Sequence, residues 1–225
     1  MPALDPRLTA ALLEQLEGRD AALRRGASRV GWKLGMGSRE RIGDSIAIGY
    51  LTTETIVPAG EWRAPVSNGA SLHVDAELCV ELGADISHDQ ASDAIRASIT
   101  RCWPALEIVD LAPRPDEPES VVVDNVFHRA VAIGPAPLPV TSDQLVSVYV
   151  NDRLRERAPW PMDIPDRLAA AARVAAAVGQ CLRAGDQIIT GSIIQLPLAI
   201  GSLVRAEFGQ FARLEIRPID HSSAH

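Results

Sequence analysis

Residues 71–82 read Ser-Leu-His-Val-Asp-Ala-Glu-Leu-Cys-Val-Glu-Leu, with an apolar residue at every second position from Leu72 onward. Because successive side chains of a strand point to opposite faces of its sheet, this alternation predicts a strand with one buried face. The other face carries Asp75 and Glu77, whose carboxylates would project from the same side. A solvated sheet face is the simpler interpretation of this acidic pair, and a metal site is the alternative.

The rest of the chain alternates strand patterns with a smaller number of helical ones. Helices are expected at about 7–26, from Ser87 to Ile99 and over 165–183, and strands at 30–35, 46–56, 104–111, 121–123, 130–133, 145–150, 187–190, 202–208 and 212–216. A proline-rich loop is expected over 112–120, and residues 218–225 are expected to form a disordered tail. These elements predict an α+β fold with a β-rich core in one domain.

Composition excludes several classes of protein. The chain has 225 residues, a net charge of −7 and no basic stripe, which argues against a nucleic-acid partner. No apolar run approaches the roughly 20 residues that span a bilayer, and the first residues lack the pattern of a signal peptide, so we expect a cytoplasmic protein. The three cysteines are isolated, which argues against a disulfide framework and a cysteine-based zinc site.

Lysine usage is unusual. Of the 22 basic residues, 21 are arginine, and Lys33 is the only lysine. An arginine-rich composition alone could leave one surface lysine by chance. However, a guanidinium stays protonated, whereas a lysine ammonium in a desolvated site can lose its proton, so a single retained lysine is a candidate for proton transfer.

Glu107 lies inside an apolar stretch, Pro-Ala-Leu-Glu-Ile-Val, over residues 104–109. A carboxylate buried there needs a cation, a set of hydrogen-bond donors or a proton. With Asp75 and Glu77 it would make an all-oxygen ligand set, which favours Mg²⁺ or Mn²⁺ over Zn²⁺. The Thr-Gly-Ser segment at 190–192 is either a plain turn or a donor of hydroxyl and N–H groups, and His128 has no evident partner.

Five segments occur in a suggestive order: 31–38 (GWKLGMGS), 75–77 leading into 82–86, 104–110 (PALEIVD), 124–125 (DN) and 184–192 (AGDQIITGS). The series resembles the 2-keto-4-pentenoate hydratase and 4-oxalocrotonate decarboxylase branch of the fumarylacetoacetate hydrolase superfamily. The resemblance implies a β-rich mixed-sheet core after an N-terminal helical segment, in a single catalytic domain over residues 1–217. It also implies a homo-oligomer.

The resemblance assigns roles to individual residues. It places Asp75, Glu77 and Glu107 on the metal, Lys33 at the proton-transfer step, and Ser192 and Asn125 beside a small 2-oxo acid or 2-hydroxydienoate substrate. Our first hypothesis is a metal-dependent hydratase of a 2-hydroxy-2,4-dienoate in aromatic or sterol-ring catabolism. Decarboxylation or tautomerisation of a related 2-oxo acid, and a non-catalytic partner subunit, remain open as alternatives.

The chain also departs from the family pattern. Asp75 stands where glutamate is usual, Val-Phe-His follows Asn125 in place of small residues, and Ser202 and Gln210 replace usual turn residues. The His–Glu pair of the superfamily's C–C hydrolases is absent between residues 38 and 50, which makes hydrolysis the less expected reaction.

Overall fold

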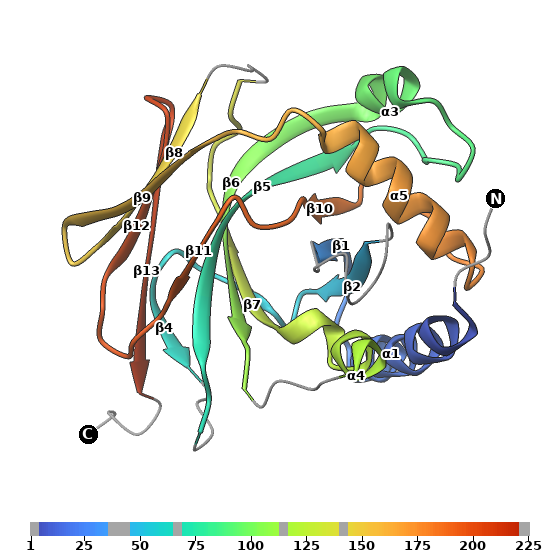
Figure 1. Cartoon of the computed structure of the whole chain (residues 1–225), viewed down its shortest axis with the longest axis horizontal. Coiled ribbons are helices and arrows are strands. Elements are labelled where there is room, and N and C mark those ends of the chain that lie inside the picture. The colour runs from blue at the N-terminus through green and yellow to red at the C-terminus, as the bar shows by residue number, and fades with distance from the viewer. Residues whose placement is uncertain (1–4, 36–45, 65–68, 113–116, 140–143, 221–225) are drawn as a thin grey trace.

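Two β-sheets with helices along one side make up the described chain (Figure 1). The computed structural model describes residues 5–35, 46–64, 69–112, 117–139 and 144–220, so most of the segment expected to lack the His–Glu pair lies outside it. The helices are α1 (Pro6–Arg24), α3 (Ser92–Ser98), α4 (Pro118–Val123), the 3₁₀ helix η1 (Asn125–Phe127) and α5 (Ile164–Ala176). No helix among these residues is long and apolar enough to cross a membrane.

The larger sheet runs in the order β2-β1-β10-β5-β6-β7-β3, with β11 paired to β5. Its strands are β1 (Arg29–Gly35), β2 (Ala47–Thr52), β3 (Ile56–Val57), β5 (Leu72–Leu82), β6 (Ile99–Asp110), β7 (His128–Ile133), β10 (Gln187–Ile189) and β11 (Ile194–Pro197). The long antiparallel pair β5–β6 is its centre, whereas β1 and β10 run parallel, so the sheet is mixed. Figure 1 shows β5 and β6 bending around β1, β2 and β10.

The smaller sheet runs in the order β4-β13-β12-β8-β9. Its strands are β4 (Gly60–Ala64), β8 (Leu145–Val150), β9 (Arg153–Pro159), β12 (Val204–Phe208) and β13 (Ala212–Asp220). Asn151 and Asp152 both have positive φ, which suits the two-residue turn that joins β8 to β9. The substituted residues Ser202 and Gln210 lie in turns before and after β12.

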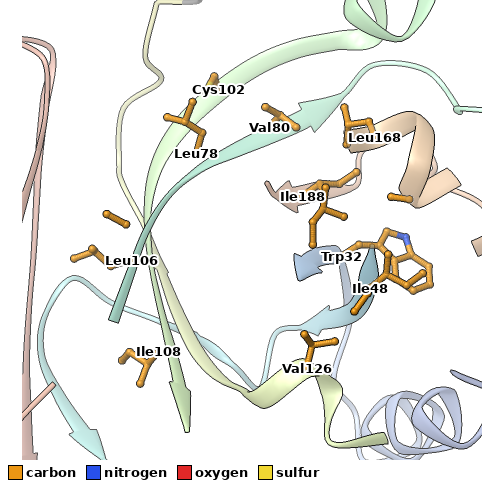
Figure 2. Packing of buried hydrophobic residues seen from close by; sticks show 14 of the residues in the cluster. Trp32, Ile48, Leu78, Val80, Cys102, Leu106, Ile108, Val126, Leu168 and Ile188 are labelled. Atoms are coloured by element: carbon orange, nitrogen blue, oxygen red, sulfur yellow. The ribbon is translucent and has the colours of Figure 1, made fainter. Parts of the chain in front are cut away.

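The outer face of the larger sheet holds the main hydrophobic core (Figure 2). Side chains such as Trp32, Leu78, Leu106 and Ile188 point to this side, where α1, α4 and α5 pack beside β2 and the smaller sheet packs beside β6. One connected cluster of buried apolar residues therefore joins both sheets and the helices. The α+β fold class with an N-terminal helix and a β-rich mixed sheet is confirmed.

Several local predictions are wrong. Residues 121–123 belong to helix α4 rather than to a strand. Strand β13 continues through Pro218 to Asp220, paired in parallel with β4, so these three residues of the expected tail are in a strand, and its other residues lie outside the described part of the chain. Helix α5 ends at Ala176 because Gly179, at φ +69°, turns the chain and lets the Gln180 N–H donate to the Ala175 carbonyl at 2.9 Å. Strands β9 and β11 lie where no strand was expected.

Strand β5 differs from its prediction in a way that matters for function. Both of its faces are buried from Val74 to Val80, not one. Asp75 is 5% exposed and Glu77 is 1% exposed, so the acidic side of the strand is not a solvated surface. The charged face lies inside the curl of the larger sheet.

Candidate metal-carboxylate site

Three buried carboxylates meet on the inner face of the curled sheet. Asp75 and Glu77 lie two residues apart on β5, and Glu107 on β6 is directly opposite Asp75 in the strand register. One ligand oxygen from each of the three lies within 4.8 Å of the others. Like charges placed opposite each other destabilise a sheet, so this cluster needs a compensating cation.

Lys33 reaches the same cluster from β1. In the sheet order β1 and β6 are separated by β10 and β5, and in a flat sheet these two strands would lie about 14 Å apart with parallel side chains. The curl instead turns the two faces toward each other, and Lys33 Nζ lies 2.6 Å from Glu107 Oε1. The lysine is 3% exposed, and its ammonium also donates to the Val126 carbonyl at 2.9 Å.

Each carboxylate of the cluster has one oxygen bound by the protein. Asp75 Oδ2 accepts from Gln195 Nε2 at 3.2 Å, and Glu77 Oε2 accepts from the Gly191 N–H at 2.9 Å. Glu107 Oε1 accepts from Lys33. Donors that hold one oxygen of a carboxylate fix its orientation and leave the second oxygen for an ion.

Burial controls the ionisation of the cluster in the absence of an ion. Burial, helped by the charge of Glu107, raises the pKa of Asp75 to about 7. Burial and the neighbouring carboxylates also raise the pKa of Glu77 well above its ordinary value. Burial raises the pKa of Glu107 too, but Lys33 and His128 outweigh it and hold that pKa below the usual value. Glu107 is thus the carboxylate of the cluster that the protein itself keeps ionised, through the Lys33 ammonium and the hydrogen bond from His128.

A small apolar cluster explains why the site is so strongly desolvated. It lies on the same inner face as the carboxylates, because Ile189 pairs with Lys33, Ala105 with Glu77 and Val131 with Glu107. Its buried members are Leu51, Cys79, Trp103, Ala105, Val131 and Ile189. These side chains fill the curl next to the charged groups and exclude water from that side.

Asn125 lies beside Lys33, but its side chain is bound to the backbone of β2. Its Oδ1 accepts from the Tyr50 N–H at 2.8 Å, and its Nδ2 donates to the Tyr50 carbonyl at 3.1 Å. The resemblance implied that Asn125 binds the substrate. In the structure, both polar atoms of its side chain are already hydrogen-bonded to the backbone of Tyr50. Asn125 anchors the segment whose Val126 carbonyl accepts from Lys33.

The backbone of that segment is strained. Asn125, Val126 and Phe127 have φ of 51°, 55° and 64°, and a β-branched residue such as Val126 rarely adopts this conformation. The segment approaches β2 closely at Gly49, where an added Cβ would lie 2.7 Å from both Asn125 Oδ1 and Lys33 Cγ. A glycine at this position is what lets the lysine and the strained turn meet.

Ser192 lies in the segment between β10 and β11, next to the Gly191 N–H that binds Glu77. Its Oγ is buried and finds no hydrogen-bond partner among the described residues. A buried hydroxyl without a partner is costly unless a ligand or water supplies one. The hydroxyl of Ser192 is therefore available for a hydrogen bond that no described residue provides.

The partner of His128, which no sequence pattern indicated, is Glu107. His128 is buried on β7 and its Nδ1–H donates to Glu107 Oε1 at 2.7 Å. The apolar stretch around Glu107 signalled that its carboxylate needed a donor, but no spacing in the sequence pointed to His128. The pairing depends on an irregularity between β6 and β7 that only the fold reveals.

The cluster fits a divalent cation on its own chemistry. Asp75 Oδ1 is buried and has no hydrogen-bond partner among the described residues, so one ligand position is unsatisfied. With Lys33 charged and His128 neutral, a divalent ion would bring the total charge of the three carboxylates and their neighbours to zero. Ligands that are all oxygen suit a hard ion such as Mg²⁺ or Mn²⁺.

Comparison with known proteins gives consistent matches, although no family model matches the chain. A 4-oxalocrotonate decarboxylase from a Pseudomonas species is 27% identical over 201 residues, which cover 82% of this chain and 77% of that protein. The solved 4-oxalocrotonate decarboxylase from Pseudomonas putida G7, complexed with magnesium and adipate, superposes with a TM-score of 0.84 at 21% identity over 94% of this chain and 86% of the other. A fumarylacetoacetate hydrolase family protein from Yersinia pestis CO92 gives 0.64 at 17% identity over 84% and 91% of the two chains.

The fold is that of the fumarylacetoacetate hydrolase superfamily. The resemblance drawn from the sequence is confirmed, because the matching proteins are 4-oxalocrotonate decarboxylases and a fumarylacetoacetate hydrolase family protein. In this fumarylacetoacetate hydrolase fold the three carboxylates and Lys33 come together inside the curl of the larger sheet, and Ser192 follows the Gly191 N–H that binds Glu77.

Proposed function

We propose that the protein is a divalent-metal-dependent lyase that decarboxylates a small 2-oxo dicarboxylic acid. The observation that carries the proposal is the buried cluster of Asp75, Glu77 and Glu107 in contact with the chain's only lysine. The choice of reaction is supported by the similarity to 4-oxalocrotonate decarboxylases. The adipate in one of these relatives is a dicarboxylate, which supports a substrate with a carboxylate at each end.

We infer that Asp75, Glu77 and Glu107 hold the ion, each through the carboxylate oxygen other than the one bound by Gln195, Gly191 or Lys33. When bound, a divalent ion supplies positive charge that stabilises the negative charge developing on the 2-oxo group of the substrate. The donors at Gln195 and Gly191 keep the carboxylates oriented before the ion arrives. The apolar cluster beside them lowers the local dielectric and so strengthens these electrostatic interactions.

Lys33 is the residue to which we assign proton transfer to the substrate. Among the described residues, Glu107 Oε1 and the Val126 carbonyl hold two of the three N–H groups of its ammonium, and we assign the third to the substrate. In decarboxylation the bond to the terminal carboxylate breaks, carbon dioxide leaves, and the electron pair moves through the conjugated chain to the 2-oxo oxygen. The resulting dienolate takes a proton, and we assign its delivery to Lys33 Nζ.

Ser192 and the backbone around it position the substrate. The unpartnered Oγ of Ser192 can donate to a substrate carboxylate or accept from a hydroxyl. Its neighbour Gly191 ties the same segment to Glu77, so the substrate contact and the metal ligand share one support.

Hydration of a 2-hydroxydienoate, the reaction favoured from the sequence, is the second candidate. The sequence segments that match the family resemble its hydratases as well as its decarboxylases. A protonation by Lys33 would also begin the addition of water, because both reactions pass through the same kind of dienolate. Tautomerisation would need only that proton transfer, and a non-catalytic partner subunit would need none of these groups.

Product mass tests these candidates together. Chelator-stripped protein is reloaded with Mg²⁺ or Mn²⁺ and incubated with a 2-oxo-hexenedioate and with 2-hydroxypenta-2,4-dienoate. We expect loss of carbon dioxide from the first compound, only in the presence of the ion. Gain of water by the second compound would select the hydratase instead, isomerisation without a mass change would select the tautomerase, and no reaction with any compound would refute an enzymatic role.

We also propose that the described residues work as one catalytic domain, because a single cluster of buried apolar residues joins both sheets. A homo-oligomer and a cytoplasmic location stay predictions of the sequence. Sedimentation analysis of the purified protein and localisation in its native cells would test them.

A further inference from the structure

His128 connects the carboxylate cluster to a part of the fold that carries no site residue. It begins β7, it is 4% exposed, and its two ring nitrogens contact different elements. Nδ1 lies 2.7 Å from Glu107 Oε1, and Nε2 lies 3.0 Å from Thr55 Oγ1, in the turn between β2 and β3. The imidazole therefore links the carboxylate of Glu107 to the hydroxyl of Thr55.

An irregularity in strand pairing is what brings His128 to this position. Ile108 pairs with Ala130, but the next residue of β6, Val109, pairs with His128, so Arg129 is an extra residue in β7. An extra residue of this kind reverses which face the following side chains occupy. Because of it, His128 points to the same inner face as Val109 and Glu107 rather than to the outer core.

The hydrogen-bond chemistry assigns a direction to the contact. A carboxylate only accepts, so the hydrogen lies on Nδ1 and His128 donates to Glu107 Oε1. The same oxygen accepts from Lys33 Nζ at 2.6 Å. One oxygen atom is thus held between an imidazole N–H and an ammonium, and the position of each donor depends on the other.

We propose that His128 is a positioning residue that acts through Glu107. It holds Oε1 in the orientation that anchors Lys33 Nζ and turns the other oxygen of Glu107 toward Asp75 and Glu77. This inference deepens the proposed function and rests on it for its catalytic part, but its structural part concerns only the free protein and its ion.

Removal of the imidazole would release Oε1 on one side. The Glu107 side chain would then gain rotational freedom, and Lys33 would lose the fixed acceptor that aims its ammonium. Partners of this kind that support a metal ligand typically account for about 10-fold to 100-fold in metal affinity or activity. Substrate binding through Ser192 would be little affected, because that residue lies on another segment.

Three substitutions separate the two nitrogens of His128. In His128→Asn the side-chain amide lies at the position of Nδ1, so a donor to Glu107 is retained. In His128→Gln the amide lies near the position of Nε2 and reaches Thr55 instead. His128→Phe keeps the ring shape and removes both groups, and His88→Phe, at an exposed position, is the control for the change in composition.

The first two measurements are turnover and ion binding. We expect His128→Phe and His128→Gln to lower kcat by about 10-fold or more with KM changed by less than about 3-fold, and His128→Asn to recover most of the loss. Calorimetric titration of chelator-stripped protein with Mg²⁺ should show the same order of affinities: wild type and His88→Phe, then His128→Asn, then the other two variants.

The third measurement needs neither substrate nor ion. Since Lys33 is the only lysine, protein labelled with ¹³C and ¹⁵N in lysine gives one side-chain signal in the NMR spectrum. In wild type and His128→Asn the two Hε protons should be inequivalent, as expected for a fixed side chain. In His128→Phe and His128→Gln the signal should move and the two protons should become equivalent.

Equal values for wild type, His128→Asn, His128→Gln and His128→Phe in the lysine spectrum would overturn the inference, whatever the reaction. If the lysine signal changes as expected but no substrate is converted by the wild type, the proposed function fails and the positioning role stands. Should His128→Phe not fold, Thr55→Val and Thr55→Ser provide the comparison. Loss of the hydroxyl that contacts Nε2 should move the lysine signal in the same direction, and Thr55→Ser should restore it.

Discussion

The ionisation of Asp75 predicts an unusual dependence of stability on pH. Its pKa in the folded, metal-free protein is about 7, whereas the ordinary value is 3.8. A group whose pKa is raised by folding contributes its full stabilisation below the ordinary pKa and loses it as the pH rises through the folded value. Each pH unit between the two values is worth about 1.4 kcal/mol, so a charged Asp75 costs the metal-free fold about 4 kcal/mol.

The accessible part of this effect is measurable. Between about pH 5.5 and about pH 7.5, the free energy of unfolding of the metal-free protein should fall by about 2 kcal/mol from Asp75 alone. Glu77, whose pKa is also raised, adds in the same direction. Binding of Mg²⁺ should reverse the trend, because the ion favours the ionised carboxylates, so the stabilisation by Mg²⁺ should grow with pH over the same range.

Urea unfolding in chelator and in excess Mg²⁺, at several pH values, measures both trends. The matched variant is Asp75→Asn, which keeps the shape and an oxygen for Gln195 but carries no charge. It should be more stable than the wild type without metal at about pH 8, have a shallower pH dependence and lose most of the response to Mg²⁺. A metal-free wild type whose stability rises from about pH 5.5 to about pH 7.5, or an Asp75→Asn variant with an unchanged Mg²⁺ response, would refute the reasoning.

Three further substitutions test the neighbours of Asp75. Lys33→Arg should fold and bind Mg²⁺ normally but lose about 10²-fold to 10⁴-fold in turnover, and normal turnover would exclude Lys33 as the proton carrier. Glu107→Gln should abolish the rise in thermal stability that Mg²⁺ gives the wild type, and an undiminished rise would remove Glu107 from the ligand set. Gly49→Ala should destabilise the protein by about 1–3 kcal/mol in urea unfolding, because its Cβ would meet Lys33 Cγ and Asn125 Oδ1 at 2.7 Å; unchanged stability would show that the turn is free to move.

The parts of the fold that follow from local rules could be predicted from the sequence. The alternation in residues 71–82 marks β5, and the leucine pattern before residue 25 marks α1, because burial of one periodic face is recorded in the residues themselves. Residues 121–123 show the limit of such rules. Three consecutive valines favour a strand, but the segment packs as helix α4 against α1, and that contact is not visible locally.

Residues of the site could be predicted only where the residue type is unusual for the sequence around it. Glu107 in an apolar stretch and a single lysine were visible as exceptions, whereas His128 and Asn125 were not assigned their contacts. The partner of His128 depends on the extra residue in β7, which changes the face of a side chain without leaving a pattern in the sequence. The contact of Asn125 with Tyr50 depends on three consecutive residues with positive φ, none of which is glycine. Such a conformation is rare and has no sequence pattern that predicts it.

These exceptions have a common physical cause. Three features of the site are unfavourable for the fold alone: three carboxylates on one inner face of the sheet, the buried Lys33 beside them, and the strained backbone of Val126 in η1. Other residues at these positions would make the fold more stable. The large apolar core on the outer face of the same sheet offsets the cost of keeping these ones. An ion that binds the carboxylates would recover part of this energy, so the site is expected to be most stable when it is ready to act on a substrate.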